Sequence, residues 1–206
     1  MDATDNVLMI FLKYPEPGKV KTRLASSIGD EKAAFYYRDF VETIFKNTRS
    51  FNYVRHVFFS PKEKAKEIKD WLGEQEVYYE QEGECLGERQ LNAFKKTLIE
   101  GVKKAVVIGT DNPLVNNEVV NEAMRSLESH DVVIGPSEDG GYYLLGMKKI
   151  KEMFFNNVDW STDKVLDQIL QNIGGSGLSV GVLKERFDVD TVDDLNLLKE
   201  KYGYER

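Results

Sequence analysis

The stretch AVVIGTDNP, residues 105–113, decides the fold. Its first four residues, 105–108, are apolar without interruption, which is typical of a parallel strand that helices cover on both faces. Such a strand belongs in the middle of its sheet. The residues after it then lie at the carboxyl edge, where open α/β sheets bind their ligands. Thr110 and Asp111 are therefore the first candidates for a functional site.

Strand-like runs alternate with helix-like stretches on both sides of this segment. Further strands are expected at 7–12, 54–59, 77–79, 131–135, 142–145 and 178–183. Helices are expected at 30–48, from a capping box at 60–63 to about 72, at 86–100 and at about 162–173, before a glycine-rich linker at 174–177. The pattern predicts a single α/β domain, residues 1–206, in which helices cover both faces of a mostly parallel sheet.

The composition is that of an ordinary globular protein, with 206 residues of which 41% are hydrophobic and 31% charged. The net charge of −7 argues against general nucleic-acid binding, so any phosphate must be bound locally. One cysteine, Cys85, cannot form an internal disulfide and excludes a thiolate zinc site. The segment from Asp2 to Asp5 lacks the basic region of a signal peptide, and the apolar run 7–12 is too short for a membrane span. We expect a cytoplasmic protein.

A basic loop follows the first expected strand. Four cations lie within eleven residues of an otherwise acidic chain: Lys13, Lys19, Lys21 and Arg23. Lysine offers phosphate a point charge, arginine offers a two-pronged fork, and backbone N–H groups around Gly18 can cradle phosphate oxygens. The alternative is a solvated basic loop. The loop is neither a P-loop, because Lys13 and Val20 stand where that motif needs Gly and Ser or Thr, nor a dinucleotide-binding glycine motif.

Three aspartates form a candidate metal site: Asp111 after the central strand, and Asp188 with Asp190 near the end of the chain. Alternate positions in an extended segment place the last two on one side. Asp111 and one of this later pair can hold a divalent metal, Mg²⁺ or Mn²⁺, against a diphosphate. For Asp190 a local alternative exists, because Thr191 and Asp194 have the spacing of a helix cap.

A glycine-rich turn, PSEDGGY at residues 136–142, is the third candidate. Its glycines, Gly140 and Gly141, let the backbone approach a ligand closely, and Asp139 supplies an exposed carboxylate. The alternative is a plain turn, because Asp-Gly is also a common hairpin signal.

Several motifs, in their order along the chain, resemble one family. They are FLK at 11–13, Pro15, PGKVKTRL at 17–24, GTDNP at 109–113, SEDGGYYLLG at 137–146, WST at 160–162 and DVDT at 188–191. The chain is similar to the bacterial GT-A-like glycosyltransferase family often found near radical-SAM and selenoprotein genes, within the nucleotide-diphospho-sugar transferase superfamily. The resemblance spans nearly the whole chain and implies a three-layer α/β/α sandwich with a mostly parallel mixed sheet.

The resemblance also implies roles for individual residues. The nucleotide phosphates would be met by Lys13, Lys21 and Arg23, and Gly18 and Lys19 of the same basic loop are further substrate-binding candidates. The base or ribose would lie beside segment 83–89, which contains Gly83 and Gly87 and has Cys85 in the place of an acidic residue. Asp111 would ligate the metal with Thr110 next to substrate, and the second substrate would face Ser137, Asp139, Gly140 and Gly141.

This fold hosts both glycosyl and nucleotidyl transfer. The leading hypothesis is glycosyl transfer from a nucleotide sugar to a small-molecule acceptor, with the metal, Lys21 and Arg23 stabilising the departing diphosphate and Asp139 acting as base. The alternative is guanylyltransferase-like nucleotidyl transfer from a nucleoside triphosphate to a phosphorylated small molecule. A third class is a nucleotide-sugar-binding protein without turnover. A haloacid-dehalogenase-like phosphatase is disfavoured, because no Asp nucleophile ends the first strand.

Overall fold

The computed structural model describes residues 5–99 and 101–205. Two expectations fall partly outside these residues, namely the segment from Asp2 to Thr4 and the end of the helix expected at 86–100. Within the described ranges, no helix combines the length and the apolar character that a membrane crossing requires.

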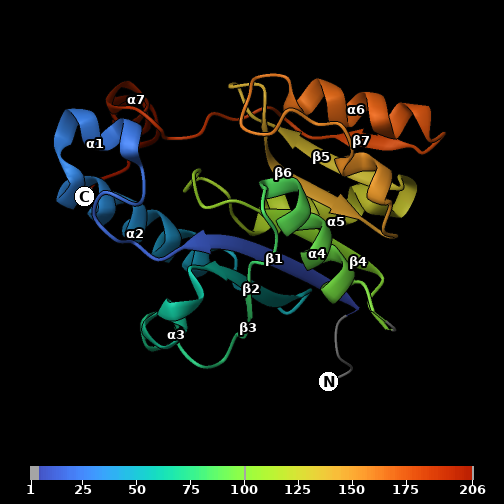
Figure 1. The fold of residues 1–206 in the computed structure, drawn as a ribbon, viewed down its shortest axis with the longest axis horizontal. Coiled ribbons are helices and arrows are strands. Elements are labelled where there is room, and N and C mark those ends of the chain that lie inside the picture. The colour runs from blue at the N-terminus through green and yellow to red at the C-terminus, as the bar shows by residue number, and fades with distance from the viewer. Residues whose placement is uncertain (1–4, 100, 206) are drawn as a thin grey trace.

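Seven strands of the described chain form one mixed sheet in the order β3-β2-β1-β4-β6-β5-β7. Their bounds are β1 Asn6–Lys13, β2 Val54–Ser60, β3 Val77–Glu80, β4 Lys104–Ile108, β5 Val132–Pro136, β6 Tyr142–Met147 and β7 Val180–Val182. Strand β6 runs antiparallel to β4 and β5, and the other neighbouring pairs are parallel. β4 is the middle strand, which confirms the position that its apolar sequence predicts (Figure 1).

Helices cover both faces of this sheet, so the molecule has three layers (Figure 1). Helices α2 (Asp30–Asn47), α3 (Ala65–Leu72) and α5 (Asn117–Ser129) pack on one face. Helices α4 (Leu86–Thr97) and α6 (Val165–Gly175), with the 3₁₀ turn η2 (Glu152–Phe155), pack on the other. The α/β/α sandwich with a mostly parallel mixed sheet is thereby confirmed.

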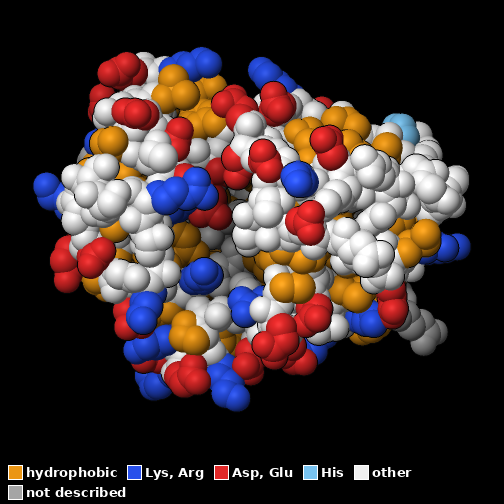
Figure 2. Space-filling view, turned by 45° about the horizontal axis from the view of Figure 1, so that its top comes forward, with side chains coloured by type: hydrophobic (Ala, Val, Ile, Leu, Met, Phe, Trp, Pro, Cys, Tyr) orange, Lys and Arg blue, Asp and Glu red, His pale blue; other side chains and the backbone are white. Residues whose placement is uncertain are grey.

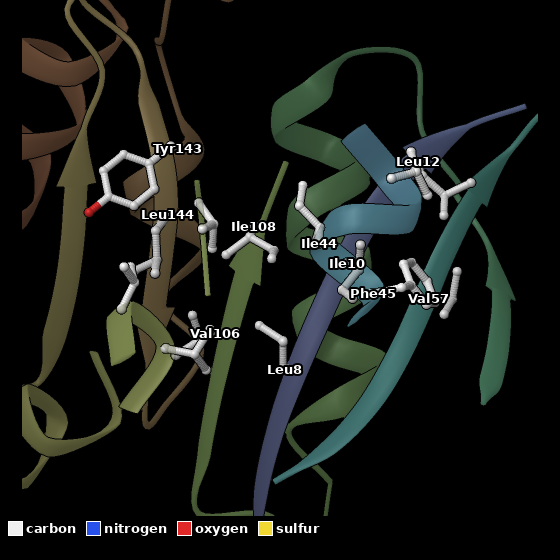
Figure 3. Close-up of a cluster of buried hydrophobic side chains, with 14 of the residues drawn as sticks. Leu8, Ile10, Leu12, Ile44, Phe45, Val57, Val106, Ile108, Tyr143 and Leu144 are labelled. Atoms are coloured by element: carbon white, nitrogen blue, oxygen red, sulfur yellow. The ribbon is translucent and has the colours of Figure 1, made fainter. Parts of the chain in front are cut away.

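Strand β1 contributes to both cores because successive side chains of a strand point to opposite faces. Leu8, Ile10 and Leu12 lie in one core, and Met9 and Phe11 lie in the other. Figure 3 shows the first core, in which side chains of β1 face those of α2. Complete burial of one such aliphatic side chain stabilises the fold by about 1.5–3 kcal/mol, so the strand that ends at the basic loop is firmly held.

A third, smaller core joins α1 (Thr22–Ile28) and α7 (Val192–Tyr202) to α2. It contains the buried residues Leu24, Phe40 and Leu198. Helix α7 begins with the capping box that its sequence predicts, in which Thr191 and Asp194 bond reciprocally. Figure 1 shows α1 and α7 together at one end of the molecule. The third core therefore brings the segment before α7 close to the basic loop before α1.

The capping box expected at 60–63 was wrong. Ser60 is the last residue of β2 and pairs with Lys13, so it belongs to the sheet rather than to a helix start. Pro61 is extended and precedes the short 3₁₀ turn η1 (Lys62–Lys64), after which α3 begins without a side-chain cap.

Two boundaries near the end of the chain also differ from expectation. Helix α6 begins at Val165 rather than near Thr162 and continues into the expected linker as far as Gly175, because Ile169 and Ile173 hold it against the second core. Strand β7 is shorter than expected, at Val180–Val182. Helices α1 and α5 were not expected. The start of α5 is capped by Asn116, whose side chain accepts two backbone N–H bonds.

Candidate functional site

Two adjoining cavities open at the carboxyl edge of the sheet. The first cavity, of about 310 Å³, lies at the ends of β1 and β4. The second cavity, of about 420 Å³, lies between the glycine-rich turn and the start of α6. Leu86 and Tyr142 line both cavities, so they form a shared wall. Figure 2 shows a recess near the middle of one face of the molecule, with basic and acidic side chains around it.

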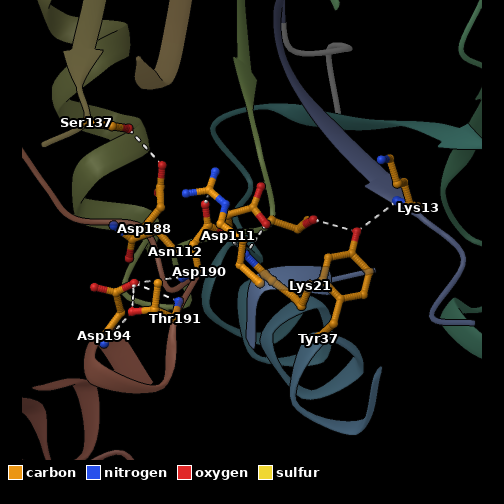
Figure 4. A network of polar contacts seen from close by, with 12 residues as sticks. Lys13, Lys21, Tyr37, Asp111, Asn112, Ser137, Asp188, Asp190, Thr191 and Asp194 are labelled. Carbon is orange, nitrogen blue, oxygen red and sulfur yellow. Dashed lines mark hydrogen bonds and ion pairs between the residues drawn. The ribbon is translucent and has the colours of Figure 1, made fainter. Parts of the chain in front are cut away.

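The ends of β1 and β4 are joined by the hydroxyl of Tyr37, which lines the first cavity. This oxygen accepts the backbone N–H of Lys13 at 2.8 Å and lies 2.9 Å from Oγ1 of Thr110 (Figure 4). Thr110 in turn donates to the Phe11 carbonyl at 3.3 Å. Burial, followed by the charge of Asp111, raises the pKa of Tyr37 to about 12, so its hydroxyl keeps its proton at neutral pH.

Lys21 is the most constrained residue of the basic loop. Its backbone is left-handed, with φ 48° and ψ 45°, and its side chain is 2% exposed. The ammonium group forms ion pairs with Asp111 and, at 3.0 Å, with Asp190 (Figure 4). Burial alone would lower the pKa of Lys21, but the two carboxylates outweigh it and raise the pKa well above its ordinary value. The lysine is therefore charged and fixed between two acidic groups.

The remaining residues of the basic loop divide between the two cavities. Lys13 and Lys19 line the first cavity with Lys21, whereas Arg23 lines the second. Arg23 lies 3.2 Å from Asp190 in an ion pair, and its side chain is otherwise largely exposed. Gly18 lines neither cavity; it takes a positive φ of 76° in the turn before Lys19.

Asp111 follows β4 and lies beside segment 187–190, which long-range hydrogen bonds hold in place. The backbone N–H of Val189 donates to the Asp111 carbonyl at 3.0 Å. The buried Asn112 side chain donates to the Phe187 carbonyl at 2.9 Å. These bonds bring residues nearly eighty positions apart to one place at the sheet edge. The carboxylate of Asp111 itself remains half exposed.

Asp188 lines the second cavity in an environment that opposes its negative charge. Ser137 donates to its Oδ2 at 2.9 Å, whereas the buried Oδ1 has no hydrogen-bond partner among the described residues. Burial and then the charge of Asp111 raise the pKa of Asp188 to about 7, although the Ser137 bond acts in the opposite direction. A cation near Oδ1 would relieve this cost.

The three aspartates predicted as metal ligands are not equivalent. Within the described ranges, no three or more His, Cys, Asp or Glu side chains cluster closely enough to hold a metal ion. Asp190 is occupied by Lys21 and Arg23. Mg²⁺, however, often uses only one or two carboxylates together with water and substrate phosphates. Asp111 and Asp188 fit that requirement: their carboxylates repel one another, Oδ1 of Asp188 has no partner among the described residues, and Asp111, although it pairs with Lys21 through Oδ1, is half exposed.

The glycine-rich turn faces the second cavity. Asp139 and Gly141 line it, and Oδ1 of Asp139 accepts the Gly141 N–H at 3.0 Å. Gly140 has φ 83°, and a Cβ there would lie 2.1 Å from the carbonyl oxygen of Asp163, so packing requires glycine. Ser137 is buried and holds Asp188 rather than lining the cavity.

The segment expected beside the base packs mainly against the protein. A Cβ on Gly87 would lie 2.2 Å from the ring of Trp160, so this glycine lets the indole close over the start of α4. Gly83 has φ 137°, and its carbonyl accepts from Arg89 Nε at 2.9 Å. All of the substrate-binding roles stay predictions. Five of the residues line neither cavity: Gly18, Gly83, Gly87, Ser137 and Gly140.

Three cavity residues, Tyr37, Gln81 and Gln90, were not singled out from the sequence. Tyr37 lies on the buried face expected for its helix, and nothing local reveals that its hydroxyl reaches the site. Gln90 carries a usable signal, because it is a polar residue four positions before the buried Phe94 on the inward face of α4.

Comparison with solved structures identifies related folds. A crystal structure from Desulfovibrio desulfuricans G20, provisionally named a nucleotide-diphospho-sugar transferase, is 36% identical, with a TM-score of 0.93 over 96% of this chain and 87% of that one. The 4-diphosphocytidyl-2C-methyl-D-erythritol synthase of Anaerococcus prevotii DSM 20548 is 11% identical, with a TM-score of 0.63 over 98% and 100%. CMP:2-keto-3-deoxy-manno-octonic acid synthetase complexed with CTP is 10% identical, with a TM-score of 0.59 over 96% and 98%. The chain thus has the nucleotide-diphospho-sugar transferase-like fold.

Comparison with curated proteins gave no match. A family model described as "Uncharacterized protein conserved in bacteria (DUF2064)" matches residues 43–162, which is more than half of the chain. The match to the Desulfovibrio desulfuricans structure extends the similarity over nearly the full length. The chain therefore belongs to the DUF2064 family.

Proposed function

We propose that this protein is a metal-dependent transferase that passes the glycosyl group of a nucleotide sugar to an acceptor without phosphate. The observation that carries the proposal is the opposite charge of the two adjoining cavities. Three lysines and one aspartate, Asp111, line the first cavity, and three aspartates with one arginine line the second. Two substrates of different charge are the simplest occupants of such a pair.

The second cavity is a poor site for a phosphorylated acceptor. Its carboxylates belong to Asp139, Asp163 and Asp188, and its single guanidinium, on Arg23, is already paired with Asp190. A phosphate there would face like charges at short range. Carboxylates do, however, accept hydrogen bonds from hydroxyl groups, so a sugar or another polyol suits this cavity.

The first cavity suits the nucleotide and its departing diphosphate. Lys13 and Lys19 line it, and Lys21 lies at its boundary with the acidic residues. Negative charge builds up on the diphosphate as the glycosyl bond breaks, and fixed cations stabilise that charge without reorganising. Asp111 and Asp188 would hold the divalent metal, which would supply further charge stabilisation at the diphosphate.

In this reaction, a residue of the glycine-rich turn accepts one proton. An acceptor hydroxyl attacks the anomeric carbon, the bond from that carbon to the diphosphate oxygen breaks, and the nucleoside diphosphate leaves. The proton of the hydroxyl passes to the carboxylate of Asp139, whose Oδ1 is oriented by the Gly141 N–H. Asp139 is therefore the proposed base.

The test begins with thermal shifts of the purified protein in a panel of nucleoside diphosphates, triphosphates and nucleotide sugars, with and without Mg²⁺ or Mn²⁺. A metal-dependent shift with one nucleotide sugar names the donor. Phosphorus NMR of the products then decides the reaction, because glycosyl transfer releases a nucleoside diphosphate. Absence of a shift with every nucleotide would remove the proposal.

A matched pair of variants tests the base. Asp139→Asn and Asp163→Asn each remove one carboxylate from the same cavity. We expect Asp139→Asn to lower kcat about a hundredfold or more and Asp163→Asn to act mainly on the acceptor KM. Full turnover by Asp139→Asn with a verified acceptor would exclude it as the base.

Nucleotidyl transfer is the second candidate, and one observation favours it. Lys13 and Lys19 also line a third cavity of about 220 Å³ beside the first, together with Glu16, so two lysines are shared between the two cavities. A triphosphate would use such an extension. Two of the similar structures are a synthetase and a synthase whose names contain a cytidine nucleotide group, and one of them was solved with CTP. Release of pyrophosphate in the product assay would favour this candidate over glycosyl transfer.

A further inference from the structure

We propose that Gln81 and Gln90 read the edge of the nucleobase in the first cavity, and that Tyr142 positions Gln90 for this task. The proposal rests on nucleotide binding in that cavity, as set out above. It deepens that function by naming the residues that would choose among nucleotides. All three side chains line the first cavity, and none of them belongs to the basic loop or to the acidic residues.

Gln90 presents a hydrogen-bond donor to the cavity. It lies on α4 and is 6% exposed, and the Tyr142 hydroxyl donates to its Oε1 at 2.7 Å. Burial raises the pKa of Tyr142 well above its ordinary value, so the hydroxyl keeps the proton that it donates. Within the described ranges, Nε2 of Gln90 has no protein partner. The amide is thus oriented with its N–H₂ group available.

Gln81 presents a hydrogen-bond acceptor. It follows β3, and both N–H bonds of its side chain are used, because Nε2 donates to the Leu12 carbonyl at 3.1 Å and to the Phe58 carbonyl at 2.9 Å. These carbonyls belong to β1 and β2, so the amide is tied to the sheet edge. Its Oε1 has no partner in the described part of the chain. Rotating the amide would break two bonds, which fixes the acceptor.

The rest of this end of the cavity suits a flat ring. Apolar residues of β1, β4 and α4 line it, namely Phe11, Leu12, Val107 and Leu86. A planar heterocycle can bury its faces against such walls while its edge meets polar groups. A fixed donor and a fixed acceptor in the same cavity can together meet a nucleobase edge, where a ring nitrogen lies next to a carbonyl or an amino group.

The experiment measures dissociation constants by calorimetry for four nucleoside diphosphates and for inorganic pyrophosphate. Gln90→Glu replaces the donor by an acceptor of nearly the same shape. We expect its affinity for the preferred nucleoside diphosphate to fall roughly tenfold or more, with the pyrophosphate affinity unchanged. Gln171→Glu makes the same chemical change on an exposed position of α6 and serves as the control.

Tyr142→Phe provides a second variant that keeps Gln90 intact. Loss of the orienting hydroxyl lets the amide rotate, so we expect the discrimination between bases to narrow while pyrophosphate still binds. Wild-type selectivity in both variants would overturn the proposal, as would equal losses for nucleotides and pyrophosphate. If the wild type binds no nucleotide at all, the proposed function fails with it, and that result is distinct from failure of base reading alone.

Discussion

The first and second cavities share a wall yet differ in what holds their charges. In the first, Lys13 is the last residue of β1, and Lys21 is locked between two carboxylates. In the second, the carboxylates of Asp139 and Asp163 are set on turns, and only Asp188 is held by a buried partner. A cationic site anchored at Lys21 beside an acidic site set on turns suits a fixed donor and an exchangeable acceptor.

The largest effect is expected from a substitution of Asp111, which lies at the boundary between the cavities. Asp111→Asn keeps the side-chain shape but removes the charge that faces both Lys21 and Asp188. We expect kcat to fall about a hundredfold to a thousandfold and the metal-dependent thermal shift to disappear. Asp70→Asn, an exposed change on α3, is the control. If the thermal shift of Asp111→Asn still depended on the metal, Asp111 would not be needed to hold the metal at this boundary.

A substitution in the glycine-rich turn should disturb the second cavity without changing a residue of the first. Gly140→Ala places a Cβ against the Asp163 carbonyl in a backbone with φ 83°. We expect the free energy of unfolding to fall by about 2–4 kcal/mol in urea, because strain and overlap add. Gly177→Ala shares the positive φ but meets no atom within 4 Å, so it should lose only about 1 kcal/mol. Similar losses in both variants would mean that the contact with Asp163 is unimportant.

Asp188 of the second cavity should make the free energy of unfolding of the metal-free protein depend on pH. The pKa of Asp188 is raised from 3.8 to about 7 on folding, so the folded state holds this proton more tightly. Its contribution to stability is therefore present below the unfolded pKa and is lost as pH rises through the folded pKa. Asp188→Asn cannot ionise, and above pH 7 we expect it to be more stable than wild type by about 1–3 kcal/mol. Equal pH dependence of the two unfolding curves, with a chelator present, would contradict this account.

The smallest expected effect is that of ionic strength on nucleotide affinity and on the acceptor KM. Exposed charges are screened over about 10 Å at 0.1 M ionic strength and about 3 Å at 1 M. Nucleotide affinity should therefore fall several-fold over that range, whereas the KM for an acceptor without phosphate should change little. An acceptor KM that rises as steeply as the nucleotide constant would indicate a charged acceptor.

The sheet was predictable because its signals are local. Residues 105–108 are apolar on both faces, and that alone places β4 at the centre. The basic loop and residues 109–113 follow strands whose order makes their ends neighbours, so these parts of the candidate site could also be named from sequence.

The division of labour among the aspartates could not be predicted. It depends on the bonds from Asn112 to Phe187 and from Val189 to Asp111, which join distant segments. These bonds leave Asp188 facing the second cavity and Asp190 facing Lys21. Likewise, nothing near Gly87 in the sequence reveals that Trp160 lies against it. Such contacts are set by tertiary packing rather than by spacing.

The left-handed backbone of Lys21 has a consequence for anyone who sets out to make this protein more thermostable. A non-glycine residue in this region costs about 1–2 kcal/mol, so a stability-guided redesign would favour Gly or Asn at position 21. Either choice would remove the ammonium group that Asp111 and Asp190 surround. The relief of backbone strain is therefore opposed by the loss of two ion pairs at a buried lysine, and a library aimed at robustness should leave this position unchanged.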